Sequence, residues 1–176
     1  MQTSVNPIGQ PVAFAGLISS AQEVLDQVSG FNAEATAGIP FGAGVIQGTG
    51  RTDAKLPATG GKMKGIFAFS FEHAPGLYGD LDTNGAVIPK GRLNILRKGR
   101  VYVVIDQSIT SIAPFSDRGY CRYGTNASDA TLGAWSNASN SNQLDATKQV
   151  VFTSDVIIAD DGTKIAEIEV DFTNAP

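Results

Sequence analysis

The sequence is poor in the two residue types that build disulfide frameworks and zinc sites. It has one cysteine, Cys121, and one histidine, His73, among 176 residues. A disulfide needs two cysteines, and a structural zinc ion is held by four ligands that are mostly Cys or His, so both are excluded. His73 is the only imidazole available as a general base, and no serine lies in a Gly-x-Ser-x-Gly segment. We therefore expect no enzyme activity, no metal and no cofactor.

Charged residues are also scarce, at 17% of the chain. The 13 basic and 17 acidic residues give a net charge of −4, which argues against binding of nucleic acid or an anionic membrane through a basic face. The acidic residues leave a catalytic carboxylate pair open in principle, but no spacing singles one out. No 18-residue apolar run could span a bilayer as a helix. The N-terminus has neither a basic nor an apolar segment, so we expect no signal peptide and a product made in the cytoplasm.

Glycine and proline are abundant instead, with 20 and 8 residues. Frequent turns and few charged, helix-forming residues favour many short strands. Apolar and polar residues alternate from Met63 to Phe71, where one face carries three phenylalanines, and again from Ala166 to Phe172. Val101–Ile105 is apolar on both faces, which predicts a central strand. The sequence thus predicts an all-β fold.

Turn and capping signals divide the chain further. Arg97–Arg100 lies between two apolar runs and predicts a tight hairpin, and Asp160–Gly162 predicts another hairpin turn before the last strand. Ser20–Glu23 has the spacing of a capping box, which predicts a helix of two turns at most. Thr131–Trp135 predicts one short strand inside a long polar stretch.

Two parts of the chain differ in apolar content. We expect residues 1–11 to form an extended N-terminal arm and residues 12–176 to form a single β-rich domain. We expect this domain to be a compact β-barrel or sandwich, jelly-roll-like or tulip-like, with long polar loops. The arm has too few apolar side chains to fold alone but enough to lie in a groove of a partner. Its candidate partner contacts are Val5, Pro7, Ile8 and Pro11.

Three single residues each have a structural and a functional interpretation. Trp135 either packs in the core or contacts a partner, because tryptophan is enriched at the centres of interfaces. Cys121 is expected to be a small core residue rather than a reactive thiol. His73 follows the phenylalanine-rich segment and is expected where a strand enters a turn, not in a catalytic site.

One segment resembles the start of a calcium-binding loop. Asp80, Asp82 and Asn84 are followed by Gly85, which matches the pattern D-x-D-x-N-G. Such a loop needs a bidentate carboxylate at its twelfth position, which here is Gly91. We therefore expect a turn built from Asx residues and glycine, and no metal site.

Several short segments, taken in order, resemble one protein family. Ala37–Val45 is similar to an early I-P-F-G-x-x-V turn, and Gly85–Gly91 leads through K-G-R-V-Y-V into Val101–Ile105. Arg118–Tyr123, Leu132–Trp135 and a closing hairpin from Val150 to Phe172 follow, and an A-G-L-I-S segment stands near the start. Together they resemble the small capsid decoration proteins of tailed bacteriophages, the structural cement proteins.

The resemblance implies a β-rich barrel or sandwich on the outer capsid surface of the virion, made in the cytoplasm of the host bacterium. It implies that the major capsid protein is the partner and that the chain clamps adjacent capsid subunits. It also implies a homo-oligomer, with a trimer favoured and a dimer possible. The family has no catalytic residues to carry over.

Two alternative functions remain open at this stage. A phage tail or baseplate structural protein would share the glycine-rich β composition and differ mainly in its partner. A β-barrel carbohydrate-binding domain would need an aromatic platform, and four tyrosines with one tryptophan offer few residues for one.

Overall fold

The computed structural model describes residues 13–19, 25–69, 81–82, 85–123, 132–139, 141–159 and 161–173. In these ranges the regular structure consists of eleven strands, and the all-β prediction is confirmed. Within the same ranges, no helix is long and apolar enough to cross a membrane.

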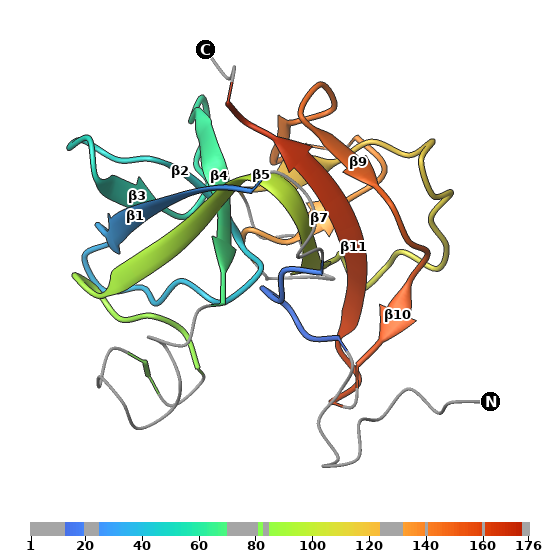
Figure 1. Cartoon of the computed structure of the whole chain (residues 1–176), viewed down its shortest axis with the longest axis horizontal. Coiled ribbons are helices and arrows are strands. Elements are labelled where there is room, and N and C mark those ends of the chain that lie inside the picture. Colours follow the sequence, from blue (N-terminus) through green and yellow to red (C-terminus); the bar gives the residue numbers. More distant parts are fainter. Residues whose placement is uncertain are drawn as a thin grey trace.

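Five strands close into a barrel (Figure 1). They are β1 (Asp26–Asn32), β2 (Gly44–Gln47), β3 (Asp53–Lys55), β4 (Met63–Ala68) and β5 (Arg92–Val104). Hydrogen bonding runs in the order β1–β3–β2–β4–β5 and then back from β5 to β1. The β1–β3 pair is parallel and the others are antiparallel. Closure pairs both sides of most strands and so removes the open edges that a flat sheet would expose.

Strand β5 is long enough, at 13 residues, to leave the barrel and enter a second layer. Its second half pairs with β11 (Lys164–Asp171), and β11 pairs in turn with β9 (Val150–Phe152) and β10 (Ile157–Ile158). A separate small sheet has the order β7–β6–β8. Its strands are β6 (Tyr120–Arg122), β7 (Trp135–Ser136) and β8 (Gln143–Asp145). Figure 1 shows β5 passing between the barrel and the layer that contains β9 to β11.

The described residues form two hydrophobic cores, and β4 and β5 contribute to both. Phe67 and Ile95 belong to the core inside the barrel, whereas their neighbours Ile66 and Leu96 belong to the second core. All four side chains are fully buried. Because successive side chains on a strand point to opposite faces, a strand between two cores must be apolar on both.

The four-residue segment Arg97–Arg100 is not a hairpin, and this expectation was wrong. The strand continues through it, with Lys98 opposite Asp26 on one side and Asp171 on the other. Gly99 has φ +131°, and a Cβ there would lie 2.5 Å from a methyl carbon of Leu25. The glycine thus allows close packing within a strand, and pairing with neighbours on both sides outweighs the local turn signal.

The helix predicted to begin near Ser20 is also wrong over the part of its range that the structure describes. Residues 20–24 lie outside the described residues, but the chain from Asp26 onward is strand β1. Along β1 the exposed Gln27 and Ser29 alternate with the half-buried Val28, as a period of two requires.

The phenylalanine-rich strand is shorter and more buried than expected. Strand β4 ends at Ala68, Phe67 is fully buried and Phe69 is half-buried, and Phe71 lies outside the described residues. The prediction of one buried face was incomplete, because Ile66 and Ala68 on the opposite face pack into the second core.

Other strand predictions are confirmed. Ala166, Ile168, Val170 and Phe172 all point into the second core. Strands β10 and β11 form the predicted hairpin, and β5 is central, as the apolar faces of its second half predicted.

A buried ion pair connects the small sheet to the end of β5. Asp106 follows β5, and its carboxylate accepts a hydrogen bond from the guanidinium of Arg122, the last residue of β6. The side chain of Asp106 is only 6% exposed and that of Arg122 only 3%. The backbone N–H of Asp106 also donates to the carbonyl of Trp135 at 2.8 Å. Because each charge is buried, removing one partner would leave the other uncompensated, so this pair holds the two sheets in one arrangement.

Gly44 provides a test of the packing between the barrel and the small sheet. A Cβ at this position would lie 2.4 Å from the sulfur of Cys121 and 3.1 Å from the indole of Trp135. We expect Gly44→Ala to lower the free energy of unfolding by about 1–3 kcal/mol through overpacking. Adding Cys121→Ala should recover part of the loss, because it removes the nearest atom. Chemical denaturation of the four proteins of this cycle measures the coupling, and strictly additive effects would contradict this packing.

Candidate partner-binding groove

A groove opens where strands β1 and β3 separate. The two strands pair only at Phe31 with Asp53 and at Asn32 with Ala54, so in the described ladders the earlier part of β1 pairs with β5 alone. The groove has a volume of about 510 Å³. Its described lining residues come from four strands and their connections: Val28, Ser29, Gln47, Arg51, Thr52, Lys62, Met63, Lys64, Arg97 and Phe172.

Four of these ten lining residues are cations and none is acidic. Arg97 has an ion pair with Asp26, with 3.5 Å between its Nη1 and Oδ2 of that residue, which is not among the lining residues. The chain as a whole carries a net charge of −4, so this positive groove stands against an acidic background. A concave site of one charge sign attracts ligands of the opposite sign.

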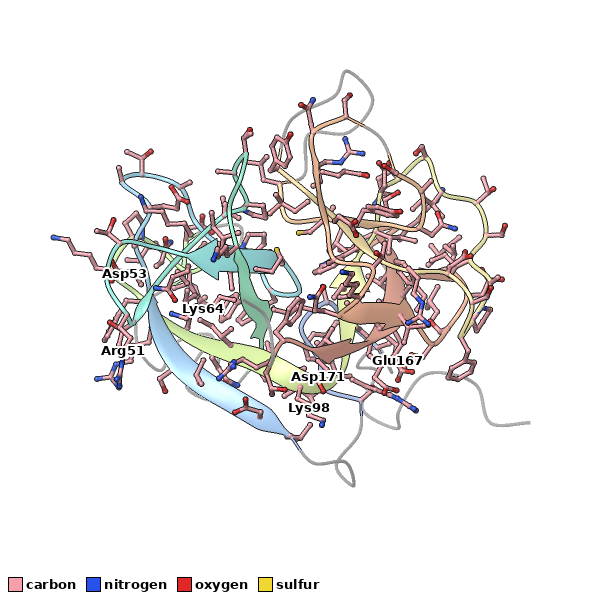
Figure 2. The ribbon with its side chains drawn as sticks, turned by 90° about the horizontal axis from the view of Figure 1, so that it is seen from above. Arg51, Asp53, Lys64, Lys98, Glu167 and Asp171 are labelled. Atoms are coloured by element: carbon pink, nitrogen blue, oxygen red, sulfur yellow. The ribbon has the colours of Figure 1, made fainter. Side chains whose placement is uncertain are left out.

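Lys64 is held at the centre of these charges by the backbone. Its ammonium donates to the carbonyl oxygens of Asp53 at 2.9 Å and Arg51 at 3.1 Å. Figure 2 shows Arg51, Asp53 and Lys64 on the same side of the molecule. Partial burial lowers the pKa of Lys64, the carboxylate of Asp53 opposes this shift, and the guanidinium of Arg97 adds to it.

Arg51 and Lys62 are exposed, and neither forms an ion pair with a carboxylate in the part of the chain that the structure describes. Arg51 lies in the turn between β2 and β3. The carboxylate of Asp53 stabilises this turn by accepting a hydrogen bond from the N–H of Gly50 at 2.7 Å. The two cations are therefore available to a ligand without first breaking an ion pair.

Four large apolar side chains are exposed among the described residues, and one of these, Ile88, is 36% exposed. Phe31 on barrel strand β1 is 44% exposed. Phe115 and Ile158 are 65% and 70% exposed and belong to the layer outside the barrel. There the N–H of Phe115 bonds the carbonyl of Phe152, and Ile158 lies on β10, which pairs only with β11 among the described strands.

The contacts predicted from the sequence are not among the described residues that line the groove. Val5, Pro7, Ile8 and Pro11 lie outside the described residues. Trp135 is 0% exposed and packs in the second core, which corrects the expectation that its side chain contacts a partner. The alternative role considered for it, core packing, is the one observed.

The candidate chemical sites can be placed in part. Cys121 is fully buried as predicted, and burial raises the pKa of its thiol, which disfavours the reactive thiolate. His73, Asp80 and Asn84 lie outside the described residues. Asp82 belongs to a turn, where its carboxylate accepts a hydrogen bond from the N–H of Ala86 at 3.0 Å. Among the described residues, no group of three or more His, Cys, Asp and Glu side chains could hold a metal ion.

The groove itself was missed from the sequence. Arg51, Lys62 and Lys64 lie within fourteen residues, which is a weak signal of a local basic patch. Arg97 joins them only because β5 lies beside β1 and β4 in the closed barrel.

Comparison with known proteins gives two findings. Residues 1–171 match the family described as structural cement protein (E217 gp24/Pam3 gp6). The fold is similar to a chain in the solved structure of the capsid of Myoviridae phage XM1, with a TM-score of 0.62 and 17% sequence identity. That similarity covers 97% of this chain and 92% of the other. No curated protein sequence matches the chain significantly.

The electrostatics of the groove are testable through the titration of Lys64. We expect Arg97→Gln to raise the pKa of Lys64, because a neighbouring positive charge is removed, and Asp53→Asn to lower it further. Both variants keep a polar side chain of similar size. The Cε and Hε chemical shifts of Lys64, followed by NMR from pH 7 to 12, report both values. Equal pKa values in the three proteins would contradict the arrangement.

Proposed function

The chain belongs to the structural cement protein family of bacteriophages, and from that membership we propose that it binds the outer surface of a phage head and clamps adjacent major capsid protein subunits. The match over residues 1–171, nearly the whole chain, is the observation that carries the proposal. The similarity to a chain of the phage XM1 capsid supports the fold.

A clamp needs binding energy rather than chemistry. A head filled with DNA fails where neighbouring subunits separate, and a protein bound across that contact must be released before it can open. A protein present at a free concentration 1,000 times its dissociation constant stabilises the structure that it binds by about 4 kcal/mol per site. Many such sites on one shell sum to a large barrier against rupture.

The placement of exposed apolar residues suits contact with two neighbours. Phe31 lies on the barrel, whereas Phe115 and Ile158 lie in the layer beyond β5. Because β5 runs through both parts, a force applied at one contact is carried to the other through a single paired strand. In this proposal the chain acts as a homo-oligomer, with a trimer favoured.

The proposed clamp predicts a change in the thermal stability of heads. Heads that lack this protein should release DNA at a lower temperature than complete heads, because they lose the bridging contacts. Adding the purified protein should restore the release temperature in a saturable manner. Release is measured by the fluorescence of a DNA-binding dye during heating. Heads that are equally stable with and without the protein, or heads that do not bind it, would contradict the proposal and favour a tail, baseplate or carbohydrate-binding role.

The N-terminal arm is proposed as one of the contacts. Removing residues 1–10 deletes Val5, Pro7 and Ile8 and should leave the domain folded, because the barrel closes through strands β1 to β5, which begin at Asp26. The shortened protein should bind heads more weakly and restore less of the release temperature. Circular dichroism and thermal unfolding provide the folding control. A shortened protein that binds like the full chain would show that the arm is not a contact.

A further inference from the structure

We propose that the groove beside β1 binds an extended, carboxylate-bearing segment of the major capsid protein, which pairs with β1 as an added strand. This inference rests on the proposed function and names the surface and the chemistry by which the capsid would be held. Two independent features of the groove support it: its charge, and an edge of β1 at Ser29 that pairs with no strand in the described ranges.

The charge of the groove selects an acidic ligand. Arg51, Lys62, Lys64 and Arg97 all line it, whereas Asp26, which pairs with Arg97, is not among the lining residues. The exposed side chains of Arg51 and Lys62 have no carboxylate partner among the described residues. Carboxylates entering the groove would form charge-assisted hydrogen bonds that these two cations lack among the residues described.

The backbone of β1 selects an extended ligand. The N–H of Phe31 donates to the carbonyl of Thr52 at 3.0 Å, so the polar backbone groups of Phe31 face β3. Backbone groups two residues apart on a strand point to the same side, so the N–H and C=O of Ser29 face this side as well. Strand β3 does not reach Ser29, which instead lines the groove. A polypeptide segment can pair with this edge as a further strand.

The remaining lining favours a polypeptide over other anions. Val28, Met63 and Phe172 place apolar surface beside the cations. A free phosphate would neither cover that apolar surface nor form backbone hydrogen bonds with the edge of β1. A nucleic acid would meet the overall charge of −4 and gain little from a groove with four cations. A protein segment with acidic and apolar side chains uses all three features.

Charge reversal tests the first feature. The double variant Arg51→Glu/Lys62→Glu should bind heads lacking this protein at least 10-fold more weakly than the wild type. Its affinity should also depend less on salt between 50 and 500 mM. The matched control, Lys90→Glu/Lys148→Glu, makes the same change in net charge at two exposed lysines outside the groove and should bind within 2-fold of the wild type. The milder Arg51→Gln/Lys62→Gln pair should show a smaller loss than charge reversal.

A backbone variant tests the second feature. Ser29→Pro removes an N–H that faces the groove rather than β5, so the barrel should remain folded while pairing with an added strand is blocked. We expect at least a 10-fold loss of head binding, with circular dichroism and thermal unfolding as folding controls. If this variant unfolds, methylation of the backbone nitrogen of residue 29 in a semisynthetic protein makes the same test.

The outcomes separate this inference from the proposed function. If the wild-type protein does not bind heads, the proposed function fails and this inference fails with it. If the wild type binds and Arg51→Glu/Lys62→Glu binds equally well, the groove is not the contact, although the clamp stands. Equal losses in the groove variant and the matched control would indicate a general charge effect and overturn the inference. Loss of binding on charge reversal but not at residue 29 would overturn the added strand.

Discussion

The register of β5 determines how the other parts of the molecule pack, because this strand pairs with β1, β4 and β11 in turn. Its first half closes the barrel between β1 and β4, and its second half is the partner of β11. Neighbouring residues such as Ile95 and Leu96 therefore lie in different cores. A shift of one residue in the register of β5 would exchange the two sets of side chains, so both cores fix the same register. The barrel and the outer layer consequently behave as one scaffold rather than two linked parts.

Strands with a strong period of two could be predicted from the sequence, whereas the path of the chain between them could not. The β11 strand and its hairpin with β10 were read correctly, because Ala166 to Phe172 alternate cleanly. Residues 97–100 look like a turn locally, and only their partners Asp26 and Asp171 make them a strand. The short capping signal near Ser20 was misleading for the same reason. Neighbours far away in the sequence determine the structure at these positions, and local propensity is the weaker influence.

The candidate site, like the fold, could be predicted from the sequence only in part. The low charge and the scarcity of cysteine and histidine were visible in the composition, and they pointed toward protein contacts. The basic groove was not visible, because Arg97 reaches Lys64 only through barrel closure and because Asp53 and Arg51 present backbone carbonyls to Lys64. Trp135 was considered as a surface contact, but it is buried. Its neighbours in sequence are polar, yet pairing places it beside Cys121 of β6 and Ile105. Polar neighbours along the chain therefore say little about the burial of a side chain whose contacts are all distant.

In the proposed role, one chain bridges two subunits of the head from outside. Electron cryo-microscopy of complete heads would show whether it does. We expect density for this fold on the outer surface, with the barrel contacting one capsid subunit and the layer of β9 to β11 contacting its neighbour. Density that touches a single subunit, or that is found on the inner surface or on the tail instead, would contradict it.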